Sequence, residues 1–312
     1  MRAIRRMGLG SDRVALVAEA AARLGLQIAE PRVISDGGNL LVHLAPAPVV
    51  ARVATLFGDD DAAYWHGVLD REVRVARHLH GRGVPAVTPT SSVDAGPHPV
   101  SGTWMTLWDY TIEQDCPDLR PADAGALLGA MGLGLQEYAH PLPVLGAWTN
   151  AADAIEKMAS AQDHRVRTAI DAWQMCDERF RSIPVNDLKP AHGDAHVGNL
   201  MCTTAGWTWL DFEDVSLMPR YWDLACMVAR TPLLDEEREF SEELVRDVLG
   251  PRPSREEEEA FTLSLAARAL VSTLANLALA QSGHADPQLA ERRLVRLPEV
   301  LEPAGLLPSK MS

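Results

Sequence analysis

The part of this sequence that most restricts its fold is a polar stretch at residues 192–199, followed by an acidic one at residues 207–213. The first is His-Gly-Asp-Ala-His-Val-Gly-Asn and contains Asp194 and Asn199. The second is Trp-Thr-Trp-Leu-Asp-Phe-Glu, in which Asp211 follows a short apolar run typical of a strand. We therefore expect a polar loop followed by two short strands around a turn at residues 203–206.

These residue types, in this order, can support phosphoryl transfer from a metal-bound nucleotide. The carboxylate of Asp194 can orient an attacking hydroxyl and take its proton, and Asn199 can offer a neutral oxygen to a divalent cation. Asp211 can hold the same cation against nucleotide phosphates. Kinase catalytic loops present a base, a metal-binding Asn and a metal-binding Asp in this sequence. The pattern predicts a small-molecule kinase.

Length, composition and charge exclude some other classes. The chain has 312 residues, 47% of them apolar, which is enough for one large domain or two lobes. The net charge of −14 excludes a nucleic-acid binder built on a broad basic surface. An acidic field could attract a cationic substrate, or it could simply keep the protein soluble.

The sequence also bears on cellular location. No run approaches the roughly 18 uninterrupted apolar residues of a membrane span, and Asp12, Arg13 and Glu19 interrupt the N-terminal apolar stretch. We expect a cytoplasmic protein without nucleic-acid or membrane partners. The four cysteines include no Cys-x-x-Cys pair, which predicts reduced thiols and no zinc site. No coiled coil or exposed apolar seam indicates an oligomeric state.

The first third of the chain has the pattern of a small sheet with one inserted helix. Ser11 can cap a helix that Gly25 ends. The expected strands cover 31–35, 40–44, 49–55, 87–93 and 103–108, and a helix is expected over 70–80. This arrangement is typical of a nucleotide-binding lobe.

After residue 108 the pattern becomes mainly helical. Pro121 can start a helix, and residues 149–180 form one long helix or two consecutive ones. Further helices are expected over 221–230, 236–249 and 256–280. We therefore expect a nucleotide-binding lobe at 1–108, and a helical lobe with the catalytic loop and acceptor site at 109–312.

Two upstream features could bind the phosphates. Asp36-Gly37-Gly38-Asn39 joins two strands and could bring backbone N–H groups to phosphate oxygens, although the same sequence suits an ordinary hairpin turn. Arg52 lies inside an apolar strand, where a buried cation needs an anionic partner. Glu72, on the following helix, is a candidate partner; the alternative is a surface charge among neighbouring arginines.

The two central motifs resemble those of the aminoglycoside phosphotransferase family, whose fold is similar to that of protein and choline kinases. The resemblance covers most of the chain and includes the hairpin, Arg52, Glu72, a linker at 106–110 and Tyr-Trp-Asp-Leu-Ala at 221–225. It implies an α+β, two-lobed, protein-kinase-like fold with a small antiparallel sheet in the N-lobe and a mainly helical C-lobe. It also implies ATP or GTP as donor, Mg2+, and a small-molecule hydroxyl acceptor, for which a cationic compound is one candidate.

The resemblance assigns roles to individual residues. Asp194 would be the catalytic base, Asn199 and Asp211 would hold Mg2+, and Glu213 would assist through a water. His192 and Asp223 would stabilise the catalytic loop, and His196 is interpreted as a local hydrogen-bonding residue. The residues expected to bind the nucleotide are Gly37, Gly38, Asn39, Arg52, Glu72, Leu107, Trp108, Asp109 and Tyr110.

The sequence departs from the wider kinase pattern at two positions. The strand cation is Arg52 rather than Lys; Arg stays charged and can bind phosphate through two N–H groups, so we expect the function to be compatible with Arg in an altered geometry. Glu213 follows Phe212 where protein kinases have Gly, and no Ala-Pro-Glu segment follows downstream. Both observations disfavour a protein kinase.

The acceptor remains open at this level. The leading hypothesis is an aminoglycoside-like or other antibiotic, which would make the protein a resistance enzyme. A primary metabolite such as choline, an amino sugar or homoserine is the first alternative, and a non-catalytic nucleotide-binding module is the second. Two residue sets could line an acceptor site: the acidic residues Asp235, Glu236, Glu237, Glu239 and 256–259, and the aromatic residues Trp148, Trp173 and Trp222.

Overall fold

The computed structural model describes residues 11–36, 39–54, 62–158 and 161–307. The chain divides into two compact units. Unit 1 comprises residues 1–116 and 200–213, and unit 2 comprises residues 117–199 and 214–312. The segment 200–213 therefore groups with the sheet rather than with the helices that surround it in sequence. The functional division at residue 108 stays a prediction.

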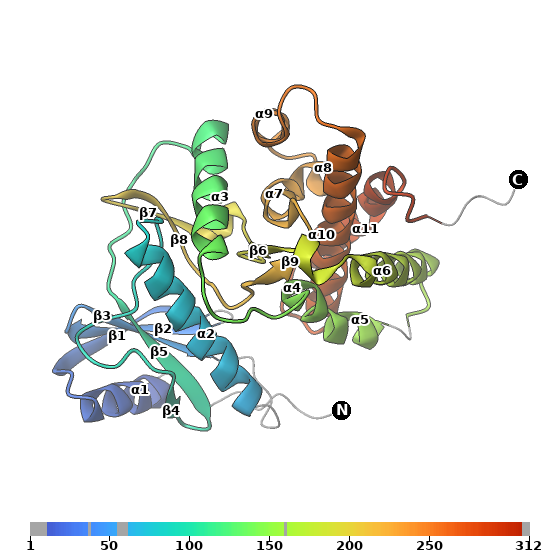
Figure 1. Ribbon diagram of the computed structural model, residues 1–312. Coiled ribbons are helices and arrows are strands. Elements are labelled where there is room, and N and C mark those ends of the chain that lie inside the picture. Colours follow the sequence, from blue (N-terminus) through green and yellow to red (C-terminus); the bar gives the residue numbers. More distant parts are fainter. Residues whose placement is uncertain (1–10, 37–38, 55–61, 159–160, 308–312) are drawn as a thin grey trace, which may run out of the picture. The chain divides into compact units, whose positions relative to one another are not determined.

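Unit 1 contains a five-stranded antiparallel sheet in the order β1-β2-β3-β5-β4 (Figure 1). A second, two-stranded sheet pairs β7 with β8. The elements are α1 (Ser11–Arg23), β1 (Ile28–Asp36), β2 (Asn39–Pro46), β3 (Val49–Ala54), α2 (Ala62–Gly81), β4 (His98–Val100), β5 (Thr103–Asp109), β7 (Leu200–Thr203) and β8 (Gly206–Trp209).

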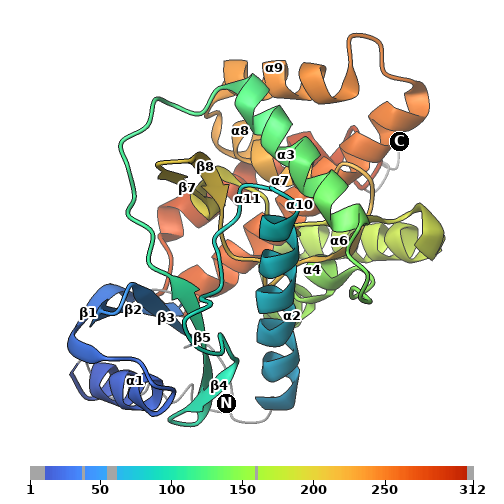
Figure 2. The same cartoon turned by 60° about the vertical axis from the view of Figure 1, so that its left-hand side comes forward.

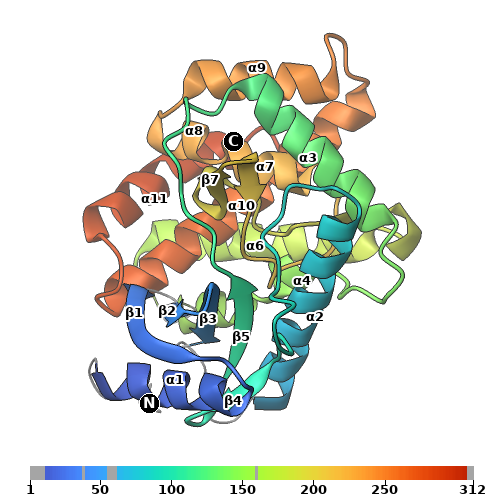
Figure 3. The same ribbon diagram turned by 90° about the vertical axis from the view of Figure 1, so that its left-hand side faces the viewer.

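Alternation of apolar residues explains the packing of this sheet. In β2, Leu40, Val42 and Leu44 are buried while their neighbours are partly exposed, as expected for a strand with one covered face. Val17 and Ala21 of α1 belong to the same hydrophobic core. Figure 3 shows α1 running across the sheet. The expected first helix and first three strands are confirmed.

Two expectations for unit 1 need correction. Residues 87–93 form no strand but only an isolated bridge at Pro89, a second bridge at Ala86 precedes them, and β4 lies later, at residues 98–100. Pro85 and Pro89 lack the N–H groups that a strand ladder needs. In addition, α2 begins at Ala62, eight residues before the expected start at residue 70.

Unit 2 is mainly helical, with one short strand pair, β6 with β9. Helix α10 packs against α5, α6, α7 and α11, and Figure 2 shows α10 among α6, α7 and α11. The elements are α3 (Pro121–Gln136), α4 (Gly146–Thr149), α5 (Ala152–Met158), α6 (His164–Ser182), β6 (Lys189–Ala191), β9 (Ser216–Met218), α7 (Trp222–Val228), α8 (Arg230–Leu234), α9 (Arg238–Leu249), α10 (Arg255–Gln281) and α11 (Pro287–Leu301). The expected helix at 149–180 is divided among α4, α5 and α6, and α11 was not predicted.

Helix α10 has the length and composition of a membrane span, the one such helix within the described ranges. The core helix of a soluble protein passes the same test, so this is weak evidence. Its start is defined by a capping box in which Ser254 and Glu257 bond each other's backbone N–H groups. Its packing against four other helices is that of a core element.

Of the three tryptophans considered for an acceptor site, two are core residues and the third, Trp173, is partly buried and stacks on one of them. Trp148 stacks on Trp173 at a centroid distance of 5.2 Å and meets Phe180 and Trp222 edge-on. Trp148 and Trp222 are fully buried. Edge-to-face aromatic packing of this kind stabilises a core. Trp148 and Trp222 are therefore packing residues rather than acceptor ligands.

The prediction of four reduced cysteines is wrong for two of them. Cys116 and Cys202 form a disulfide within unit 1, with their Cα atoms 6.0 Å apart. The segment after β5 runs beside β7, as shown by the hydrogen bond from Gln114 N to the Cys202 carbonyl. The two cysteines are 86 residues apart in sequence, so their spacing gave no indication of this contact. Cys176 and Cys226 are buried thiols.

Candidate active site

In unit 1, Arg52 joins three carboxylates from two other segments. It donates to Glu72 Oε2 at 2.7 Å, to Asp211 Oδ1 at 2.9 Å and to Glu213 Oε2 at 2.6 Å. The Glu72 side chain is 1% exposed and that of Arg52 is 9% exposed. The alternative of Glu72 as a surface charge is therefore wrong, and β3, α2 and the segment after β8 meet at one guanidinium.

The positive and negative charges of this cluster do not balance. Burial acts to lower the pKa of Arg52, but Glu72, Glu213 and Asp211 outweigh it, so that the pKa is raised and the cation is retained. Burial raises the pKa of Glu72, while the charge of Arg52 opposes that rise. Three carboxylates share one cation, which leaves a formal excess of two negative charges when all are ionised. An additional cation would balance this excess.

The backbone around Asp211 holds its carboxylate toward that cluster. Asp211 has a φ of +61°, in the left-handed region that few residues other than Gly adopt. The preceding strand is fixed by the bond from Trp209 N to the Pro85 carbonyl, and the following Phe212 is fully buried. Arg71 donates to the Glu213 carbonyl at 2.8 Å. Buried Phe212 thus separates two carboxylates, Asp211 and Glu213, that both reach Arg52.

In residues 107–110, the segment predicted to bind the nucleobase, three of the four backbone N–H groups already donate hydrogen bonds within unit 1. The N–H groups of Leu107, Asp109 and Tyr110 bond to the carbonyls of Ala95, Thr88 and Pro48. Trp108 pairs with Val50 in the sheet. These three N–H groups are therefore not donors to a nucleobase, and any contact from this segment would use its carbonyl oxygens.

The predicted phosphate hairpin is only partly described. Asn39 begins β2 and pairs with Ala54 across the sheet. Gly37 and Gly38 lie outside the described residues. Their assignment stays a prediction.

In unit 2, the loop at residues 192–199 is anchored from α7. Asp223 accepts bonds from His192 N at 2.7 Å and from Gly193 N at 3.0 Å, as predicted for a residue that stabilises the loop. Trp222 Nε1 donates to the Gly193 carbonyl at 2.7 Å. A Cβ on Gly193 would lie 2.2 Å from the Asp214 carbonyl oxygen, and the φ of Gly193 is +90°. This position therefore requires glycine.

The Asp194 carboxylate receives donors on both oxygens. Arg268 donates to Oδ1, Asn199 Nδ2 donates to Oδ2 at 3.2 Å, and His196 Nε2 lies 3.3 Å from Oδ2. Gly198 N donates to Nδ1 of His196 at 2.9 Å, so in the neutral ring Nε2 carries the proton and faces Asp194. The assignment of His196 as a local hydrogen-bonding residue is consistent with this geometry.

This environment keeps Asp194 ionised. Burial acts to raise the pKa of Asp194, but the positive charge of Arg268, and then the bond and charge of His196, hold that pKa well below its usual range. The side chain is 28% exposed, so it is accessible to a second molecule. Asp194 is thus an oriented carboxylate rather than a strong base.

Sequence reasoning missed Arg268. This residue lies on α10, 74 positions from Asp194, and belongs to no motif. It is the one charged residue between Glu259 and Gln281. A lone cation in an apolar helix needs an anionic partner, and that rule could have identified it.

Asn199 is oriented suitably for a cation. Its Nδ2 donates to the Asp194 carbonyl at 2.9 Å as well as to the carboxylate, so its Oδ1 is directed away from both. Asp211 and Glu213 supply carboxylate oxygens. Mg2+ prefers such oxygen ligands and usually takes the rest from phosphates and water, so each of these side chains, taken within its own unit, is chemically suited to it. Within the described ranges no cluster of three or more metal-binding side chains is found.

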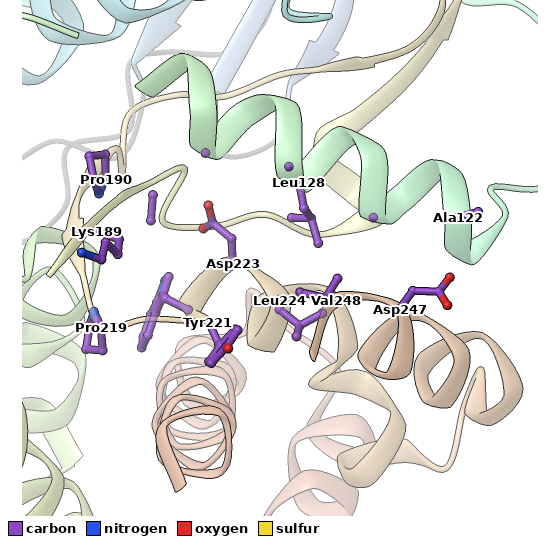
Figure 4. A pocket seen from close by; sticks show the side chains of 15 residues that line it. Ala122, Leu128, Lys189, Pro190, Pro219, Tyr221, Asp223, Leu224, Asp247 and Val248 are labelled. Carbon is purple, nitrogen blue, oxygen red and sulfur yellow. The ribbon is translucent and has the colours of Figure 1, made fainter. Parts of the chain in front are cut away.

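Unit 2 also contains a cavity of about 470 Å3 next to the loop anchor. Figure 4 shows Asp223 and Leu224 of α7 and Leu128 of α3 around it. Three glycines of α3, at positions 125, 129 and 132, contribute backbone rather than side chains to its wall. A Cβ on Gly129 or Gly132 would meet nothing within 4 Å.

Comparison with known sequences agrees with this geometry. A profile of the phosphotransferase enzyme family matches residues 8–256, which is most of the chain and includes the two motifs at residues 192–199 and 207–213. The chain belongs to the phosphotransferase enzyme family. No curated protein matches it significantly. The resemblance noted from the motifs is thereby confirmed.

Solved structures show the fold of this phosphotransferase. Amicoumacin kinase hAmiN, in complex with AMP-PNP, Ca2+ and Ami, has a TM-score of 0.67 at 13% identity over 94% of this chain and 95% of that one. A ternary complex of a thermostable mutant of aminoglycoside phosphotransferase APH(4)-Ia with AMP-PNP and hygromycin B gives a TM-score of 0.62 at 13% identity, over 94% of this chain and 98% of that one. Choline kinase LicA from Streptococcus pneumoniae gives 0.61 at 13%, over 94% and 100%.

The predicted fold class is therefore confirmed. The phosphotransferase has the two-lobed, protein-kinase-like α+β fold, with a small antiparallel sheet and a mainly helical part. As a member of this family it is an enzyme of the small-molecule kinase class, acting on a hydroxyl group. The small molecules named in the descriptions of these similar structures differ widely, so they do not identify its acceptor.

Proposed function

We propose that this enzyme transfers the γ-phosphate of ATP or GTP, bound with Mg2+, to a hydroxyl of a small molecule in the cytoplasm. The observation that carries the proposal is the environment of Asp194, an accessible carboxylate oriented by Arg268, His196 and Asn199. A protein that only bound nucleotides would have no need of an accessible carboxylate oriented in this way.

On the donor side, Arg52, which donates to Glu72, would contact the α- and β-phosphates. The hairpin at residues 36–39 would add backbone contacts to the phosphates, and residues 107–110 would contact the nucleobase through carbonyl oxygens. Asn199 and Asp211 would hold Mg2+, and Glu213 would assist through a water. Bound Mg2+ would neutralise charge on the phosphates during transfer.

On the acceptor side, Asp194 would accept a hydrogen bond from the acceptor hydroxyl and align its oxygen with the γ-phosphorus. As the new O–P bond forms, the bond from the γ-phosphorus to the β,γ-bridging oxygen breaks and ADP or GDP leaves. The hydroxyl proton moves to Asp194 and then to solvent. A carboxylate of low pKa suits this late transfer, because the hydroxyl becomes acidic only when its O–P bond is well formed.

Four of the eight acidic residues considered for an aminoglycoside pocket have local partners instead. Asp235 pairs with Arg238, Glu236 with Arg230, and Glu259 with Arg255. Glu257 caps α10. Such short-range pairs on exposed helix ends are ordinary surface features. A polycationic acceptor therefore loses support, whereas other antibiotics and primary metabolites remain candidates.

A coupled assay of ADP and GDP release tests the proposal. We would assay purified protein with Mg2+ and ATP or GTP against aminoglycosides, nucleoside antibiotics, choline, amino sugars and homoserine. Acceptor-dependent release that Asp194→Asn abolishes, and the exposed control Asp187→Asn leaves intact, would support it. Near-normal turnover of folded Asp194→Asn, or neither turnover nor nucleotide binding with any pair, would contradict it.

A further inference from the structure

The side of α10 that includes Arg268 bears no carboxylate. Arg268, Ser272 and Asn276 are partly exposed and lie one turn apart on this side. From residue 260 to residue 281 the helix contains no Asp or Glu. A molecule on this side of Asp194 would meet a guanidinium, a hydroxyl and an amide. This environment differs from one that recognises a polycation.

Arg293 of α11 adds a second guanidinium beside Ser272. Its Nη1 donates to Ser272 Oγ and lies 3.4 Å from the Ser272 carbonyl. The residue is 7% exposed, and its Nε is buried without a hydrogen-bond partner. Within the described part of the chain, no carboxylate lies at ion-pair distance from Arg293. A buried cation without an anion is costly to maintain.

The charges around Arg293 do not compensate it. Burial lowers its pKa, and the positive charges of Arg230 and Arg268 lower it further. Glu236 acts in the opposite direction, but it already pairs with Arg230 at 2.5 Å. Asp194 is likewise paired with Arg268. Glu236 and Asp194 therefore each have a cationic partner, whereas Arg293 has no anionic partner among the described residues.

We propose that Arg293 and Arg268 together bind an oxyanion group, a carboxylate or a phosphate, on the acceptor molecule. A guanidinium matches both groups because its N–H donors lie in one plane and bind two oxygens at once. The inference rests on the proposed function, because it takes the bound molecule to be the phosphoryl acceptor. The acceptor would then carry a hydroxyl for Asp194 and an oxyanion for the arginine pair.

The test is direct binding of simple oxyanions to the full chain. Malonate and inorganic phosphate would be titrated by calorimetry at constant ionic strength in chloride buffer. We expect saturable binding to the wild type, weakened about tenfold or more by Arg293→Met. Arg296→Met, on the same helix and paired with Glu299 in the native protein, should bind as the wild type does. The tighter of the two probes identifies the carboxylate or the phosphate as the preferred group.

Two results would overturn the inference. One is the absence of saturable oxyanion binding to the wild type, and the other is equal binding by Arg293→Met and the wild type. If Arg293→Met does not fold, Arg293→Lys keeps the charge but loses the planar pair of donors, and it should bind more weakly than the wild type. Equal binding by Arg293→Lys would also overturn the inference. Binding of a fluorescent ATP analogue, measured on the same samples, distinguishes failure of this inference from failure of the proposed function.

Discussion

Arg268 on α10 donates a hydrogen bond to Oδ1 of Asp194, so the carboxylate that we propose orients the acceptor has a mainly buried cation as its partner. The contact joins a residue of the family motif to one that no motif includes. It has two effects on Asp194, because it fixes the direction of the carboxylate and keeps it ionised.

Replacing Arg268 with Met should lower kcat by roughly a hundredfold. Loss of the cation raises the pKa of Asp194, because Arg268 is the largest influence that lowers it. The acid limb of the kcat profile should therefore move to higher pH, since Asp194 must be ionised to accept the proton. Arg268→Lys should restore part of the rate. Steady-state kinetics from acid to neutral pH, with exposed Arg246→Met as control, would show this; an unmoved acid limb would refute it.

Replacing Arg52 with Met should destabilise the protein by about 3–5 kcal/mol, because three carboxylates around β3 would lose their shared cation. Arg32 provides a matched control in the same sheet, since its side chain is 69% exposed and pairs only with Glu30 among the described contacts. Arg32→Met should change stability by less than about 0.5 kcal/mol. Urea unfolding followed by tryptophan fluorescence measures both. Similar losses in the two variants would show that the Arg52 cluster is not a structural contact.

Local sequence patterns identified much of the fold and the motif residues. Alternation in β2 and helical spacing in α1 and α3 are properties of short segments, so they can be read without tertiary information. The motif around Asp194 was recognisable for the same reason. The prolines at 85 and 89 were present in the sequence, and giving them more weight would have removed the false strand.

The remaining parts depended on contacts between distant segments. The bond between Arg268 and Asp194 spans 74 residues, and the disulfide between Cys116 and Cys202 spans 86. No periodicity encodes such pairings. Residues 200–213 also belong to the same compact unit as the sheet, although the chain on either side of them belongs to unit 2. Tertiary packing decides that assignment.

The pH dependence of stability should reveal the buried carboxylate of Glu72. Its folded-state pKa is raised by burial, so the native state binds a proton more readily than the unfolded chain does. Its contribution to stability is then largest below the unfolded pKa and is lost as the pH rises through the folded one. Glu72→Gln lacks this titration. Its stability relative to wild type should improve as the pH rises from about 5 to about 8, as measured by urea midpoints. Exposed Glu113→Gln should show no such trend, and a decline for Glu72→Gln would contradict the assignment.

Two glycines of unit 2 should respond to alanine in opposite directions. Gly129 lies inside α3 and faces open space, so Gly129→Ala should stabilise the protein by about 0.5–1 kcal/mol through helix propensity. At Gly193 the new Cβ would overlap the Asp214 carbonyl at a positive φ. Gly193→Ala should therefore cost about 2–5 kcal/mol and displace Asp194, which lowers turnover as well. Urea unfolding and nucleotide diphosphate release would be measured on both variants. If Gly193→Ala kept full stability and turnover, the close approach of the Asp214 carbonyl could not be what fixes the catalytic loop.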